Sequence, residues 1–149
     1  MALIVGDKIP DFICKDSNGN DFDSKMYIGK QAVVIYFYPK DDTPGCTAQA
    51  CSFRDNYQYF INMGAEVIGI SSDTVNSHID FKNKFKLPFI LLSDENKKIR
   101  KMFGVAKDFF GLVDGRTTYV ADKNGIIQLI FDSSFAELHI KKSMEILNI

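Results

Sequence analysis

One of the three cysteines in this sequence stands in a setting that favours a reactive thiol. Cys46 follows Thr43, Pro44 and Gly45, where an apolar strand-like run gives way to a helical pattern. In the first turn of a helix, unpaired backbone N–H groups and the positive end of the helix dipole favour the thiolate, the nucleophilic form of cysteine. Gly45 would let the backbone approach a ligand closely. The pattern predicts nucleophilic or redox chemistry at Cys46, and the alternative for a lone cysteine is a small half-buried residue.

A helix terminus is not sufficient to ionise a thiol. A free thiol with a pKa of about 8.5 is only about 3% thiolate at pH 7, and reaching about 90% requires roughly 3.4 kcal/mol. The helix terminus contributes about 0.3–2 kcal/mol, so a cation within about 4–6 Å is expected as well. The sequence contains only three arginines, and Arg116 begins a predicted strand. If that strand runs antiparallel to residues 32–38, Arg116 reaches Cys46; otherwise it is an arginine in solvent.

The elements around Cys46 predict a strand, a helix and a second strand. Residues 32–38 are apolar without alternation, which is typical of a central strand buried on both faces. Residues 67–70 form a second such run. Between them, Thr43 and Pro44 suit the start of a helix and Gly64 suits its end. This order predicts two parallel strands joined by a helix.

The rest of the chain predicts further helices and strands. We expect a hairpin at 12–22, a helix from residue 72 or 73 that ends before Pro88, a short helix closed by Gly104, two strands at 117–121 and 126–131 joined through Asn124-Gly125, and a last helix opened by a capping box of Ser134 and Glu137. The predicted fold class is therefore α/β, with a mixed central sheet flanked by helices and an N-terminal β-hairpin.

Length and composition limit the possible functions. The 149 residues, 46% of them hydrophobic and 25% charged, predict one globular domain over 1–149. A net charge of -1 argues against nucleic acid or anionic lipid as a partner, and no apolar run approaches the roughly 18–20 residues that cross a bilayer. Three cysteines favour a reducing compartment. We expect the cytoplasm, or a plastid or other organelle if a transit peptide has been removed.

The stretch from Pro39 to Thr47, with Cys51 five residues after Cys46, resembles the active-site signature of the peroxiredoxins. Within them it is most similar to the bacterioferritin-comigratory-protein/peroxiredoxin Q subfamily. The resemblance extends over nearly the whole chain, including residues 6–12, 71–73, 77–78, 87–89, 93–94 and 115–125. It implies a thioredoxin-like fold and thiol-dependent reduction of hydrogen peroxide and organic hydroperoxides.

The same resemblance implies roles for individual residues. Cys46 would be the peroxidatic cysteine, with Thr43 and Arg116 beside it and Cys51 as the resolving cysteine. The residues that would support the site are Pro39, Pro44 and Gly45. The subfamily also implies recycling by thioredoxin or a similar dithiol protein, a monomer, and no metal, flavin or haem cofactor.

The spacing of the two cysteines poses a geometric problem. On an ideal helix, residues five apart have Cα atoms about 8.6 Å apart, whereas a disulfide needs less than about 7 Å. We therefore expect the first turns of the helix to unwind after Cys46 is oxidised. Cys14 is expected to be a small core residue, and it is the alternative resolving cysteine if Cys51 cannot reach.

Three other functions remain open at this point. A thioredoxin-type disulfide reductase would need a second cysteine three residues after Cys46, where this chain has Gln49. A redox sensor without enzymatic activity, or an inactive homologue, would keep the same fold. The two histidines and three cysteines lack zinc-site spacing; His78 is expected to be packed on a helix and His139 to face solvent.

Overall fold

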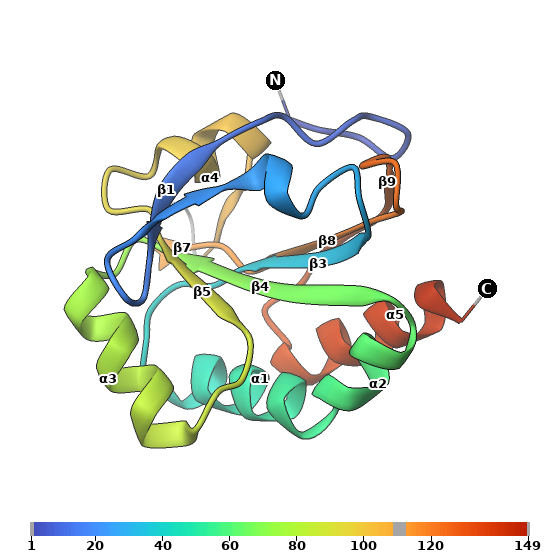
Figure 1. Ribbon diagram of the computed structural model, residues 1–149. Coiled ribbons are helices and arrows are strands. Elements are labelled where there is room, and N and C mark those ends of the chain that lie inside the picture. Colours follow the sequence, from blue (N-terminus) through green and yellow to red (C-terminus); the bar gives the residue numbers. More distant parts are fainter. Residues whose placement is uncertain (1, 109–112, 149) are drawn as a thin grey trace.

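A seven-stranded mixed sheet forms the centre of the computed structural model, which describes residues 2–108 and 113–148 (Figure 1). Its strands lie in the order β2-β1-β5-β4-β3-β8-β9. They are β1 Ile13–Asp16, β2 Asp21–Asp23, β3 Ala32–Phe37, β4 Ala65–Ser71, β5 Ile90–Ser93, β8 Thr117–Ala121 and β9 Ile127–Asp132. A separate short pair is formed by β6 Lys107–Asp108 and β7 Val113–Asp114.

The central strand is β3, as the apolar run predicts. It pairs in parallel with β4 and antiparallel with β8. Val33, Ile35 and Phe37 face one apolar core, while the alternate residues Val34 and Tyr36 face the other. Both faces are buried because helices or loops cover both sides of the sheet, and this explains the absence of alternation in the sequence.

Helices lie on both sides of the sheet (Figure 1). They are α1 Pro44–Asp55, α2 Tyr57–Asn62, α3 Val75–Phe85, α4 Lys98–Phe103, α5 Ala136–Leu147 and the 3-10 turn η1 Ser24–Met26. Side chains of α1, α2, α3 and α5 share one core with Tyr36 of β3. Residues of α4 and of the N-terminal segment share the other core with Phe37. The mixed thioredoxin-like architecture expected from the sequence is confirmed.

The structure differs from the sequence-based expectations at several local points. The single helix expected over 44–64 is two helices, because the Asn56 side chain donates to the Ser52 carbonyl (2.8 Å) and competes with helix continuation. The capping box is wrong, since α5 is preceded by Phe135 and has no side-chain cap. Strand β5 was not expected; it has four residues and no distinctive periodicity.

His139 is buried, so the expectation that it faces solvent is wrong. Its Nδ1 lies 2.7 Å from the Thr118 hydroxyl and its Nε2 lies 2.7 Å from the Ser133 carbonyl. These contacts join α5 to the sheet. A single polar residue on an amphipathic helix gives no sign of such partners, because they come from other elements.

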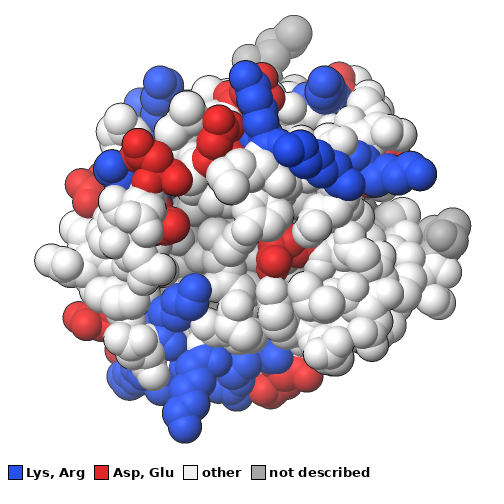
Figure 2. Space-filling view, viewed as in Figure 1, with Lys and Arg blue, Asp and Glu red and all other residues white. Residues whose placement is uncertain are grey.

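The surface seen in Figure 2 carries both signs of charge, and neither sign covers it. This agrees with the net charge of -1. Among the helices of the described residues, none combines the length and apolar character needed to cross a bilayer.

Candidate active site

Cys46 lies in the first turn of α1, directly after the carboxyl end of the central strand. Pro44 begins the helix, where its fixed φ suits the first helical position and its missing N–H is not needed. The side chain of Cys46 is 2% exposed and packs against the core that contains Phe53 and Tyr36. The sulfur is therefore largely shielded from solvent and close to unpaired N–H groups of the helix terminus.

Arg116 contacts the Cys46 sulfur. Its Nη2 donates to Sγ over 3.3 Å, and its side chain is only 6% exposed. The contact follows from strand pairing: Phe37 at the end of β3 stands opposite Thr117 at the start of β8, so the preceding residue lies beside the start of α1. The expectation that Arg116 reaches Cys46 is confirmed.

Gln49 accepts a hydrogen bond from the second terminal nitrogen of the same guanidinium. The Nη1 of Arg116 donates to Oε1 of Gln49, which is fully buried one turn after Cys46. The two acceptors lie on one face of α1 and use both terminal nitrogens of the planar fork. We did not identify Gln49 as a site residue from the sequence. The available signal was a polar residue on the buried face of the helix, between Cys46 and Phe53.

The remaining expected site residues lie close to Cys46 in the chain. Thr43 precedes α1 with an extended backbone, but its hydroxyl donates to the Lys40 carbonyl (2.9 Å) and caps no helix N–H. Pro39 is half-buried in the loop after β3. Gly45 faces Arg116, since a Cβ placed there would lie 3.1 Å from Nη2. This loop therefore passes directly beside the sulfur and the guanidinium.

The other two cysteines are separated from each other by the sheet. Cys51 is half-buried on α1, and both it and Cys46 are free thiols. Cys14 lies on β1 and packs against the core on the opposite side of the sheet from Cys46. Burial, with Asp94 and Asp16 nearby, raises the pKa of the Cys14 thiol to about 12. Cys14 is thus placed as the core residue expected from the sequence, and it is a poor nucleophile.

Arg100 joins the two loops that meet at the site. Its Nη1 donates to the Gly115 carbonyl (2.8 Å) and its Nη2 to the Tyr38 carbonyl (2.9 Å). Its guanidinium also lies over the Phe37 ring, 5.5 Å from the centroid. Because Gly115 precedes Arg116 and Tyr38 precedes the Cys46 loop, this buried side chain fixes the two segments relative to each other.

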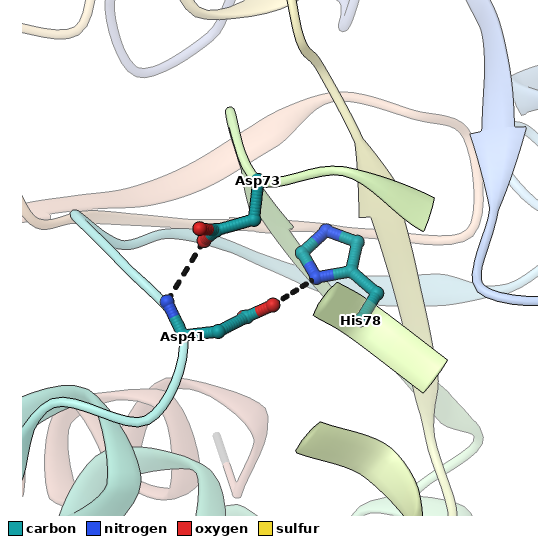
Figure 3. Close-up of side chains that lie close together, drawn as sticks. All are labelled: Asp41, Asp73 and His78. Atoms are coloured by element: carbon teal, nitrogen blue, oxygen red, sulfur yellow. Dashed lines mark hydrogen bonds and ion pairs between the residues drawn. The ribbon is translucent and has the colours of Figure 1, made fainter. Parts of the chain in front are cut away.

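Asp41, Asp73 and His78 form the group among the described residues whose atoms could surround a metal ion. Their candidate ligand atoms all lie within 4.8 Å of one another (Figure 3). The cluster lies beside the loop that leads from β3 to Cys46. Its hydrogen bonds are described below.

Comparison with protein families identifies most of the chain. Residues 5–130 match the model of the AhpC/TSA family. Among curated proteins, the chain is 52% identical over 143 residues to peroxiredoxin Q, chloroplastic, from Oryza sativa subsp. japonica, covering 95% of this chain and 65% of that protein. It is 51% identical over 143 residues to the Sedum lineare protein of the same name, covering 95% of this chain and 76% of that protein. The chain thus spans about two thirds of the length of several of these relatives.

Solved structures give the same match. Peroxidoxin BcpB from Mycobacterium tuberculosis superposes with a TM-score of 0.88 at 32% identity, covering 97% of this chain and 96% of that chain. Peroxiredoxin Q from Xanthomonas campestris superposes with a TM-score of 0.84 at 28% identity, covering 92% of this chain and 89% of that chain.

Proposed function

The chain belongs to the AhpC/TSA family and, within it, to the peroxiredoxin Q group. From this premise we propose that it is a thiol peroxidase that reduces hydrogen peroxide and organic hydroperoxides. The observation that carries the proposal is the 3.3 Å contact between Arg116 Nη2 and Cys46 Sγ at the start of a helix. A buried guanidinium beside a sulfur at that position supports a thiolate nucleophile. The proposed catalytic unit is the single domain 1–149.

In the first step, the Cys46 thiolate attacks the terminal oxygen of the hydroperoxide. The S–O bond forms while the O–O bond breaks, and the departing oxygen takes a proton to leave as alcohol or water. The sulfur is oxidised to a sulfenic acid and the peroxide is reduced.

Thiolate formation explains only a small part of such a rate. Raising the thiolate fraction from about 3% to about 90% gives roughly 30-fold, whereas enzymes commonly reach 10⁶-fold or more. The larger contribution must come from donors that stabilise negative charge on the departing oxygen. We propose the Arg116 guanidinium and the Cys46 backbone N–H for this role. The Thr43 hydroxyl would be a third donor once it turns away from the Lys40 carbonyl, to which it donates in this structure. Pro39, Pro44 and Gly45 support the loop and let the peroxide approach.

In the second step, Cys51 attacks the sulfur of the Cys46 sulfenic acid. An S–S bond forms, the S–O bond breaks and water leaves. A dithiol protein such as thioredoxin then reduces the disulfide and restores both thiols. The cycle uses no metal or organic cofactor, and a monomer suffices for it. For the compartment we propose the cytoplasm. A plastid is the alternative, because the plant relatives are named chloroplastic.

The test is thioredoxin-coupled peroxide consumption by the wild type, Cys46→Ser, Cys51→Ser and Cys14→Ser. Cys46→Ser should abolish both turnover and dimedone labelling of the sulfenic acid. Cys51→Ser should form the sulfenic acid but stop thioredoxin-dependent turnover. Cys14→Ser is the matched control and should keep the wild-type rate. Wild-type protein that consumes no peroxide while it reduces insulin would overturn the proposal in favour of a disulfide reductase.

A further inference from the structure

The loop between β3 and α1 is held by the cluster of Asp41, Asp73 and His78, in which Asp41 and His78 are buried and Asp73 is half-buried (Figure 3). Asp41 belongs to the loop itself, Asp73 follows β4, and His78 lies on α3. The spacing of their atoms resembles a metal site. The hydrogen bonds of the cluster show whether these side chains are free to bind a metal ion or are already used to hold the loop in place.

The Asp41 carboxylate already has three protein groups at hydrogen-bonding distance. Its Oδ1 accepts from the Tyr38 hydroxyl (2.5 Å), and its Oδ2 accepts from the Ser77 hydroxyl (2.9 Å). The same Oδ2 lies 2.6 Å from Nδ1 of His78. The second ring nitrogen of His78, Nε2, donates to the Leu92 carbonyl (2.8 Å), since that carbonyl is only an acceptor. A metal ion would have to displace these partners.

The Asp73 carboxylate is used in the same way. Its Oδ2 accepts from the backbone N–H of Asp41 (2.8 Å) and from the Ser71 hydroxyl (2.6 Å). Both the backbone and the side chain of Asp41 are therefore tied to segments that follow β4. The cluster is a largely buried network of hydrogen bonds, and such networks rigidify the segments they join.

The tie acts on the residues that lead to Cys46. Asp42 has a φ of 56°, a left-handed conformation that costs a non-glycine residue energy unless its surroundings hold it. The Thr43 hydroxyl donates to the Lys40 carbonyl, so its direction depends on the position of this turn. The carbonyl of Thr43 in turn accepts from the Thr47 N–H inside α1. A shift at Asp41 thus reaches the groups proposed to receive the peroxide.

We propose that His78 is a positioning residue for peroxide reduction, whose hydrogen bond to Asp41 holds the 38–43 loop and with it the start of α1, where Cys46 lies. This inference rests on the proposed function. His78 touches neither the sulfur nor the guanidinium, and it acts on the rate through the geometry of the loop. Displacements of about 1 Å can cost about 100-fold in rate, so loss of one tie is expected to be measurable.

Two substitutions separate the two hydrogen bonds of the ring. His78→Asn places an amide nitrogen near the Nδ1 position and keeps a donor to Asp41, whereas His78→Gln places it near Nε2 and keeps the donor to Leu92. Both remove the imidazole. Ser24→Ala is the control, since it removes a buried hydrogen bond to the Phe12 N–H on the other side of the sheet.

The measurements are the second-order rate constant of Cys46 oxidation by hydrogen peroxide, the thiolate absorbance titration and thermal unfolding. His78→Gln should slow oxidation about tenfold or more, while His78→Asn stays within about threefold of the wild type. Both should leave the thiolate titration unchanged, because the His78 ring bonds to Asp41 and Leu92 and to neither Cys46 nor Arg116. Ser24→Ala should lower stability and leave the rate unchanged.

Equal rates for His78→Gln and His78→Asn, or a rate loss in proportion to lost stability across all three variants, would overturn the inference. A wild type that fails to react with peroxide would overturn the proposed function instead, so the two failures are distinguishable. If His78→Gln does not fold, Tyr38→Phe takes its place. It removes a different donor to the Asp41 carboxylate, and the same slowing relative to Ser24→Ala is expected.

Discussion

The guanidinium of Arg116 donates two hydrogen bonds that have different roles. Nη2 donates to the sulfur of Cys46, and Nη1 donates to the amide oxygen of Gln49. The second bond fixes the plane of the guanidinium, so that the first would keep its direction when charge moves from sulfur to oxygen in the proposed reaction. A single positive charge without this planar fork would stabilise the thiolate but would not be aimed at the departing oxygen.

Arg116→Lys tests this distinction at the level of one residue. The substitution keeps the charge and loses the fork, so we expect the rate of peroxide reduction to fall about 100-fold. The thiolate fraction at pH 7, measured by absorbance, should fall much less. Arg54→Lys is the control. It makes the same replacement in the last turn of α1, away from Cys46, and should keep the wild-type rate of peroxide reduction. A rate loss that equals the loss of thiolate would show that charge alone matters.

Helix α1 carries both cysteines of the proposed cycle and cannot remain intact through it. The helix is continuous from Pro44 to Asp55, and the ideal geometry separates the Cα atoms of Cys46 and Cys51 by about 8.6 Å. A disulfide between them needs less than about 7 Å. The reduced form is therefore the regular form of this element, and the oxidised form must unwind part of it.

Amide hydrogen exchange should detect this change. Residues 44–52 should be more protected in the reduced protein than in the disulfide form, because unwinding breaks their helical hydrogen bonds. Residues of the central strand β3 should be equally protected in both forms and serve as the internal control. Equal protection of 44–52 in the two forms would contradict the unwinding.

The segment before β8 is constrained by close packing at Gly115. A Cβ at this residue would lie 2.0 Å from the Ala106 carbonyl oxygen, a backbone atom that cannot move aside easily. Gly115→Ala should therefore destabilise the fold by about 1–3 kcal/mol or more and displace Arg116 from Cys46. The expected result is a lowered midpoint of thermal unfolding together with a slower reaction of Cys46 with peroxide. If the unfolding midpoint and the reaction rate both keep their wild-type values, the loop accommodates the added Cβ without loss of stability.

At the scale of the whole molecule, the sheet separates two cores with different roles. The core that contains Cys46 is built largely from α1, α2, α3 and α5, whereas Cys14 and α4 belong to the other. His139 anchors α5 within this arrangement through Thr118 and Ser133. Burial lowers the pKa of His139 to about 4, and the nearby positive charge of Arg116 acts in the same direction.

The lowered pKa of His139 predicts acid sensitivity. The unfolded chain binds this proton near pH 6.5, whereas the folded protein binds it only near pH 4. The contribution to stability is therefore complete above pH 6.5 and is lost as the pH falls to 4, by about 3 kcal/mol in total. In denaturant titrations at pH 7, 6, 5 and 4, His139→Asn should lose less stability than the wild type over this range. Parallel losses in the two proteins would contradict the prediction.

The amino-acid sequence alone predicted those features that depend on neighbouring residues. Pro44 begins a helix because its φ suits the first turn, and residues 32–37 form a strand because an apolar β-branched run has few other solutions. Cys46 follows the loop that joins the two elements. Contacts between distant residues depended on the fold. The sequence made the contact of Arg116 with Cys46, 70 positions away, conditional on an antiparallel strand, and the pairing of β3 with β8 provides it. The partners that Gln49, Arg100 and His78 acquire from other elements followed only from the folded chain. The physical reason is that local patterns act through the backbone of a few residues, whereas a buried hydrogen bond depends on which elements pack together.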